Sequence, residues 1–213
     1  APWWGSIATE RLIGEFMVYL ALATLWNLLA GYTGLVSVGQ QAFVGIGAYT
    51  LISLALLAGW NPIFAVPIAG LVAAIIAIPI CKLVFRLQGA YCAIGTWVIA
   101  EAIRLFVAQI TVLGGGSGIS LPTDIMKMVG ETKFWREATI YWLALALGFG
   151  ALALVYGLLR SKLGLALTAI RDNELASESL GVRIERIKYT VYVLVAGMTG
   201  MVGSLIELQK VRM

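Results

Sequence analysis

The chain has 213 residues, of which 61% are hydrophobic and 12% are charged, and its formal net charge is +4. A soluble domain carries roughly 25% charged residues, so this composition excludes an ordinary soluble globular protein. The positive charge forms no basic tract with interleaved aromatic residues, so no nucleic-acid partner is expected, and loop charges that set membrane topology explain it better. The chain has no histidine, and its two cysteines lie in or beside apolar runs. Metal sites, cofactors, disulfide frameworks and histidine-based catalysis are therefore not expected.

The apolar runs are long enough to cross a bilayer as helices, which takes about 20 residues each. A transmembrane β-barrel would instead show segments of about 10 residues with alternating polarity. We therefore predict an all-α, polytopic transmembrane helical bundle that forms one transmembrane domain over residues 1–213. The chain begins without Met and ends just after an apolar run, so we expect it to be a fragment. The six predicted spans are residues 12–30, 38–59, 63–83, 90–112, 139–159 and 189–208.

A polar, glycine-rich stretch, Gly31–Thr50, opens the second predicted span and is unusual at membrane depth. Small residues let helix backbones approach closely, and polar side chains can form hydrogen bonds across such a contact. The stretch therefore predicts either a tightly packed helix seam or a segment that lines a translocation path, and the two interpretations are compatible. The residues that carry this prediction are Gly39, Gln40, Gln41, Gly45, Gly47 and Tyr49.

The fourth predicted span contains two charges, Glu101 and Arg104, which lie three residues apart and hence on one helix face. Charged side chains at this depth are costly and seldom face lipid. One interpretation is a self-neutralising pair buried between helices. The other is that one of the two touches a substrate or gates the path. The residue pattern leaves both open.

The stretch Gly114–Pro122 interrupts regular structure between the fourth and fifth spans. A phosphate-binding loop is excluded because no Gly-Lys-Ser/Thr sequence follows and no strand precedes it. We predict that residues 113–138 form an external connecting loop.

The loop at residues 160–188 holds six of the fifteen Lys and Arg residues, so we place it in the cytoplasm. Asp172 or Asn173 is a suitable helix N-cap, and Gly181 suits the left-handed position just past a helix end. Glu174 would lie in the first turn, where the helix dipole favours a negative charge. These signals predict one short helix that lies across the membrane surface, although a plain surface connector has the same composition.

Three stretches in this order resemble the branched-chain amino-acid permease family of ABC importers, in its M-type subunit. The stretch Ala169–Gly181, followed by a Lys and the last span, is similar to the cytoplasmic coupling loop of that family. The stretch Gly31–Thr50 is similar to its early glycine-rich segment. Residues 87–91, 100–104 and 115–119 resemble its central signature.

The resemblance implies a permease in the inner membrane of a bacterium or archaeon, without enzymatic activity of its own. It implies ABC ATPase subunits, a second permease subunit and an extracytoplasmic solute-binding protein as partners, besides membrane lipid. Family members continue beyond this loop, and they often have Ala where Ser177 and Ser179 stand. By analogy, the ATPase-coupling residues are Ala169, Ile170, Arg171, Asp172, Asn173, Glu174, Leu175, Ser177, Glu178 and Gly181.

Two other functions fit the composition. An ion-coupled secondary transporter or channel would act without an ATPase and use Glu101 as a proton or ion site. The absence of a clear inverted repeat speaks against it. A membrane-embedded enzyme is disfavoured because the chain lacks histidine and a clustered carboxylate pair. Related permeases carry urea or amides, so the substrate stays open.

Overall fold

The computed structural model describes residues 7–85, 87, 90–110, 129 and 132–210. Within these residues every regular element is a helix, which confirms the all-α prediction. The glycine-rich stretch at 114–122 lies outside the described residues. The helices are α1 (Ile7–Asn27), the π-helix η1 (Leu28–Tyr32), α2 (Gln40–Leu57), α3 (Pro62–Val84), α4 (Ala90–Ala108), α6 (Lys133–Arg160), α7 (Lys162–Asp172), α8 (Glu174–Ser179) and α9 (Ile184–Lys210).

Six of these helical segments are long and apolar enough to span a membrane: residues 8–32, 40–57, 62–84, 91–108, 134–160 and 184–210. The fifth begins earlier than predicted, because the Thr132 side chain caps α6 by accepting a hydrogen bond from the Trp135 amide. The sixth likewise begins at Ile184 rather than 189. Hydropathy marks only the apolar part of a helix, so the sequence analysis assigns the polar first turns of α6 and α9 to loops.

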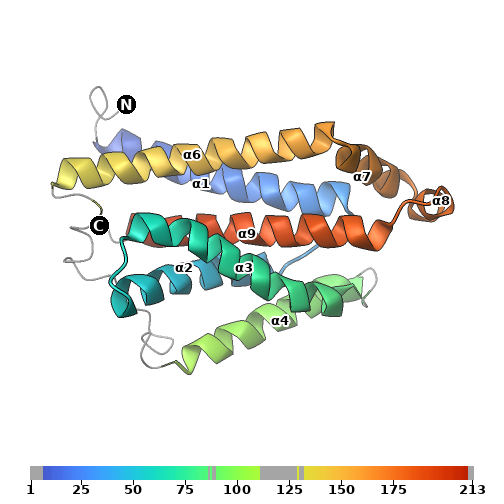
Figure 1. Cartoon of the computed structure of the whole chain (residues 1–213), viewed down its shortest axis with the longest axis horizontal. Helices are drawn as coiled ribbons and strands as arrows, with labels where there is room; N and C mark the ends of the chain where they lie inside the picture. Colours follow the sequence, from blue (N-terminus) through green and yellow to red (C-terminus); the bar gives the residue numbers. More distant parts are fainter. Residues whose placement is uncertain (1–6, 86, 88–89, 111–128, 130–131, 211–213) are drawn as a thin grey trace.

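The long helices lie side by side along one axis (Figure 1). Helix α9 runs through the middle, with α1 and α6 on one side and α2 and α3 on the other, and α4 is outermost. The short helices α7 and α8 extend beyond one end, opposite the end where α1 begins and α9 finishes. The bundle therefore has a coupling end, as we call the α7–α8 end, and an opposite end.

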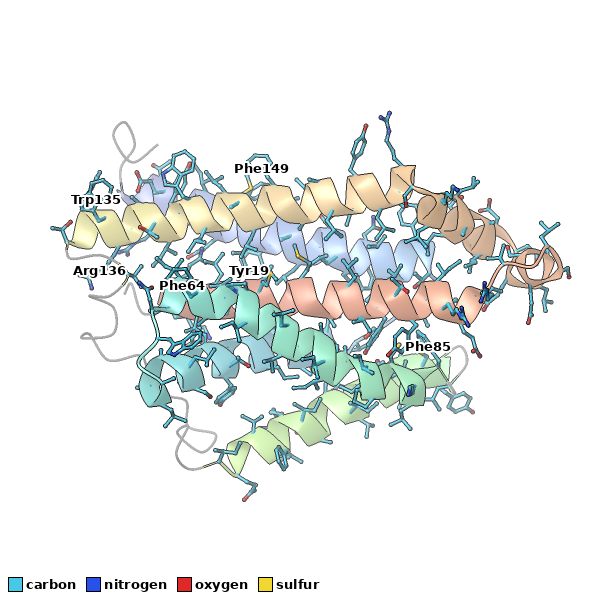
Figure 2. The ribbon with its side chains drawn as sticks, viewed as in Figure 1. Tyr19, Phe64, Phe85, Trp135, Arg136 and Phe149 are labelled. Carbon is cyan, nitrogen blue, oxygen red and sulfur yellow. The ribbon has the colours of Figure 1, made fainter. Side chains whose placement is uncertain are left out.

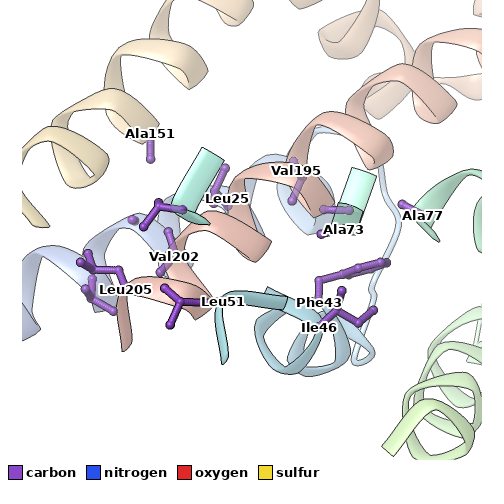
Figure 3. Packing of buried hydrophobic residues seen from close by; sticks show 14 of the residues in the cluster. Leu25, Phe43, Ile46, Leu51, Ala73, Ala77, Ala151, Val195, Val202 and Leu205 are labelled. Atoms are coloured by element: carbon purple, nitrogen blue, oxygen red, sulfur yellow. The ribbon is translucent and has the colours of Figure 1, made fainter. Parts of the chain in front are cut away.

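Helix α9 is the packing centre of the bundle, since 67% of its apolar window is buried. Glycines bring its backbone against its neighbours. A Cβ added at Gly47 of α2 would lie 1.9 Å from the Gly200 carbonyl oxygen, and one added at Gly203 would lie 2.2 Å from that of Val44. Buried side chains such as Phe43 and Val195 fill the remaining space (Figure 3). The α2–α9 contact is thus a seam at which two helix backbones approach closely.

Large apolar side chains also cover the outside of the bundle. Phe149 and Trp135 on α6 and Phe64 on α3 are between 57% and 66% exposed (Figure 2). Contiguous apolar surface of this extent is not stable in water. A lipid environment accommodates it, in agreement with the six candidate spans.

Candidate functional site

An irregular segment, residues 33–39, joins η1 to α2 and enters the bundle without helical structure. The Val38 amide donates a hydrogen bond to Thr96 Oγ1 of α4 at 3.2 Å, and Trp26 Nε1 donates to the Ser37 carbonyl at 3.3 Å. Thr96 is the seventh residue of α4, so this contact lies roughly 9 Å along that helix. Non-helical backbone at membrane depth is tolerated where protein buries it or where it lines a cavity.

A cavity of about 390 Å³ lies between α2 and α4. Helix α2 contributes Gln41, Gly45 and Tyr49, and α4 contributes Glu101 and Arg104. The fold therefore brings together five of the eight residues predicted for the path or seam. Apolar walls, which the sequence interpretation did not include, come from Ala42, Ile46, Ala100, Ile103, Val107 and Ala108.

Glu101 and Arg104 form an ion pair at this cavity, with Arg104 Nε 2.9 Å from Glu101 Oε2. Their side chains are 43% and 65% exposed, respectively. Of the two interpretations left open, burial of the pair between helices does not describe these exposed side chains. The physical reason is the light packing of α4, since only 17% of its apolar window is buried. The pair faces open space beside α2.

The other three predicted residues lie in helix contacts. Gly47 packs on α9, and a Cβ at Gly39 would lie 2.4 Å from the Thr96 carbonyl oxygen of α4. Gln40 is half-buried, and its Nε2 has no hydrogen-bond partner among the described residues. Gly39 is therefore a close-approach position that fixes where α2 starts against α4.

The coupling end contains two short helices, whereas the sequence pattern predicted one. The Ser161 side chain caps α7 by accepting from the Leu163 amide, and α7 buries Leu167 and Ile170 against the bundle. The sequence analysis did not predict α7, because residues 162–172 were assigned to the charged loop at 160–188. Asn173 has extended dihedrals that end α7, and its side chain accepts from the Ala176 amide at 3.0 Å to cap α8.

Gly181 follows α8 with φ of 83°, the left-handed conformation that the sequence predicted there. Two contacts of charged side chains add to the burial of α7 in attaching the short helices to the bundle. Lys188 Nζ of α9 donates to Glu174 Oε1 at 2.8 Å. The Arg171 guanidinium lies 5.7 Å from the centre of the Tyr32 ring of η1, within the range of a cation–π interaction. Glu174 and Arg171 therefore hold the short helices in place.

The predicted coupling residues divide by exposure. Ile170 and Ser177 are buried toward the bundle, at 3% and 2% exposed, and Ala169 is half-buried. Leu175 and Leu180 are 78% and 82% exposed, a high value for leucine. We call the exposed predicted residues, 171–175, 178 and 181, together with Leu180, which was not predicted as a coupling residue, the coupling surface. Its members are Arg171, Asp172, Asn173, Glu174, Leu175, Glu178, Leu180 and Gly181.

Six helices that are long and apolar enough to span a membrane define a multi-pass membrane protein. The sequence model of the family described as "Branched-chain amino acid transport system / permease component" matches residues 8–212. The chain belongs to this family. No cluster of potential metal ligands occurs among the described residues.

Two curated relatives are the high-affinity branched-chain amino acid transport system permease proteins LivM of Escherichia coli and Salmonella typhimurium. The first is 32% identical over 96% of this chain and 53% of the relative, and the second is 32% identical over 89% and 50%. The chain therefore spans about half the length of the curated relatives it matches. No solved structure matches significantly.

Proposed function

We propose that this chain is membrane-spanning permease machinery of an ABC importer for branched-chain amino acids or a similar small polar solute. The family match over residues 8–212 carries the proposal. The importer would lie in the inner membrane of a bacterium or archaeon. A separate ATPase subunit would hydrolyse ATP, a second permease subunit would complete the path, and an extracytoplasmic binding protein would deliver the solute.

The coupling surface is the proposed ATPase contact. Leu175 and Leu180 offer exposed apolar anchors, and Arg171, Asp172 and Glu178 surround them with charges. Exposed apolar groups within a polar rim are typical of protein interfaces. The flanking loop is rich in Lys and Arg, which favours the cytoplasmic side for this end of the bundle.

The test is co-purification of the transporter with its ATPase from membranes. Leu175→Asp is expected to lower ATPase recovery at least tenfold while leaving membrane insertion unchanged. Leu57→Asp is the matched control, because Leu57 is a similarly exposed leucine, at 68%, at the opposite end of the bundle. Equal recovery of the ATPase with Leu175→Asp and with the unchanged protein would refute docking at the coupling surface.

An ion-coupled carrier remains the second candidate class, with Glu101 as the ion site. The Arg104 guanidinium already occupies both Glu101 carboxylate oxygens, with Nε at 3.0 Å from Oε1 and 2.9 Å from Oε2. A lone cation bound at Glu101 would have to displace Arg104 and leave the guanidinium unpaired, which favours the ABC importer. Leucine uptake that collapses without ATP and survives dissipation of ion gradients would distinguish the two.

A further inference from the structure

We infer that the cavity between α2 and α4 binds the charged head group of a zwitterionic α-amino acid, with Arg104 on its carboxylate and Glu101 on its ammonium group. The inference rests on the proposed transport function and assigns the residues and the ligand chemistry to it.

The position of the ion pair is the first support. Glu101 and Arg104 are the twelfth and fifteenth of the 19 residues of α4, roughly 16 and 21 Å along the helix axis. A hydrocarbon core about 30 Å thick makes both charges intramembrane. Intramembrane charges face protein or water rather than lipid. Here they face a cavity, because both residues line it together with Gln41 and Tyr49 of α2.

The openness of the pair is the second support. A pair whose only role is to cross-link helices gains from being enclosed between them, whereas this one lies within a single helix, three residues apart. Its side chains are 43% and 65% exposed. Both groups therefore retain bonding capacity toward a ligand in the cavity. The guanidinium has five N–H donors, and its planar fork matches a carboxylate.

The charge balance of binding selects the ligand. An α-amino acid carries an ammonium and a carboxylate on one carbon atom, so it can exchange the single Arg104–Glu101 pair for two ion pairs. No net charge enters the membrane, and neither protein charge loses a partner. A ligand with a carboxylate alone or an ammonium alone would leave one protein charge without an opposite charge at membrane depth, which is unfavourable. The site thus discriminates zwitterions from singly charged analogues.

The rest of the cavity suits a small aliphatic side chain. Ile46, Ile103 and Val107 supply apolar wall beside the two charges, while Gln41 and Tyr49 add polar groups. The volume of about 390 Å³ falls within the range of roughly 300–1,000 Å³ that is usual for small-ligand sites. A branched-chain amino acid therefore finds both kinds of partner in one place.

The experiment measures equilibrium binding of radiolabelled leucine to the transporter assembled with its ATPase, without the solute-binding protein. Two competitors separate the charges: leucinamide keeps the ammonium and lacks the carboxylate, and isocaproate keeps the carboxylate and lacks the ammonium. With the unchanged protein, each is expected to compete at least tenfold more weakly than leucine. Competition by either one as strong as that of leucine would overturn the inference.

The variant Glu101→Gln/Arg104→Gln removes both charges together, so it leaves no unpaired charge that would by itself unfold α4. We expect at least a tenfold loss of leucine binding with normal ATPase co-purification. The matched control is Glu207→Gln/Lys210→Gln, which removes a pair of the same spacing on α9, where Lys210 Nζ lies 3.4 Å from Glu207 Oε2. This control is expected to bind leucine normally.

Leucine binding by the double variant within twofold of the unchanged protein would overturn the inference. So would failure of the double variant to assemble, because the pair would then hold the fold rather than a ligand. The proposed function is tested separately, through ATPase co-purification and ATP-dependent uptake by the unchanged transporter. Failure there, with zwitterion-selective binding intact, would refute the importer and leave the binding site standing.

Discussion

Replacement of Gly47 by alanine tests whether the α2–α9 seam depends on backbone contact. The added Cβ would lie 1.9 Å from the Gly200 carbonyl oxygen and 2.7 Å from its carbonyl carbon. Backbone atoms cannot rotate away as a flexible side chain does, so the two helices must separate along the seam. Overpacking of this kind costs about 1–3 kcal/mol. That corresponds to a factor of roughly 5 to 150 in the ratio of folded to unfolded protein, since about 1.4 kcal/mol is tenfold.

Gly45→Ala is the matched control for Gly47→Ala. Gly45 is on the same helix, two residues earlier, and an added Cβ there meets no described atom within 4 Å. Both substitutions change helix propensity alike, so the difference between them isolates the seam. The assay is the thermal midpoint of the detergent-solubilised transporter, followed by size-exclusion chromatography after heating. Gly47→Ala is expected to lower the midpoint, and Gly45→Ala to leave it unchanged or raise it.

Equal midpoints for the two alanine variants would refute this description of the seam, since they would mean that α2 and α9 do not touch at Gly47. A second substitution guards against an effect peculiar to α2. Gly203→Ala on α9 would place its Cβ 2.2 Å from the Val44 carbonyl oxygen and is expected to destabilise similarly.

Three further outcomes follow from single contacts. Thr96→Val removes the hydroxyl that accepts a hydrogen bond from the Val38 amide of the irregular segment. We expect the unfolding free energy to fall by about 1–3 kcal/mol, measured as a lower thermal midpoint. An unchanged midpoint would show that this hydrogen bond is dispensable. Asn173→Ala removes the N-cap of α8 and is expected to lower the stability of this helix by about 1 kcal/mol, which would appear as faster amide hydrogen exchange in α8 only. Exchange that is equally changed in all helices, or unchanged in α8, would contradict this expectation. Glu174→Gln weakens the hydrogen bond from Lys188 of α9 to α8. Buried Cys92 lines a second cavity together with Glu174, so we expect its thiol to react faster with maleimide in this variant. An unchanged reaction rate would mean that other contacts hold α8.

Composition and the length of the apolar runs were sufficient to predict the helical class, because a membrane-spanning chain has few alternatives in lipid. Runs of apolar residues of spanning length mark helices without knowledge of their neighbours. Local capping was equally readable: Asn173 caps α8 and Gly181 has positive φ, because these depend on the residue's own side chain or lack of one. The Glu101–Arg104 pair forms for the same reason, since three residues along a helix bring side chains together.

Features that depend on distant residues were not predicted. The irregular segment at 33–39 is held by Thr96 and Trp26, residues far from it in sequence. Nothing in the glycine-rich stretch itself indicates that α2 starts only at Gln40. The exposure of Glu101 and Arg104 likewise reflects how lightly α4 packs on its neighbours. Helix α7 was missed because its apolar face becomes apparent only where Leu167 meets the bundle.

Helix α9 contacts both α8, at one end of the bundle, and α2, which lines the α2–α4 cavity. Lys188 near its start bonds Glu174 of α8, and roughly 22 Å further along the helix Gly203 contacts the backbone of Val44. Backbone-to-backbone contacts contain no flexible side chain that could absorb a displacement, and packed interiors transmit strain. A shift of α9 would therefore move α2 with it. Helix α4 is held close to the start of α2 at Gly39 and otherwise packs lightly, so the same shift would alter the spacing between Gln41 and Glu101 across the cavity.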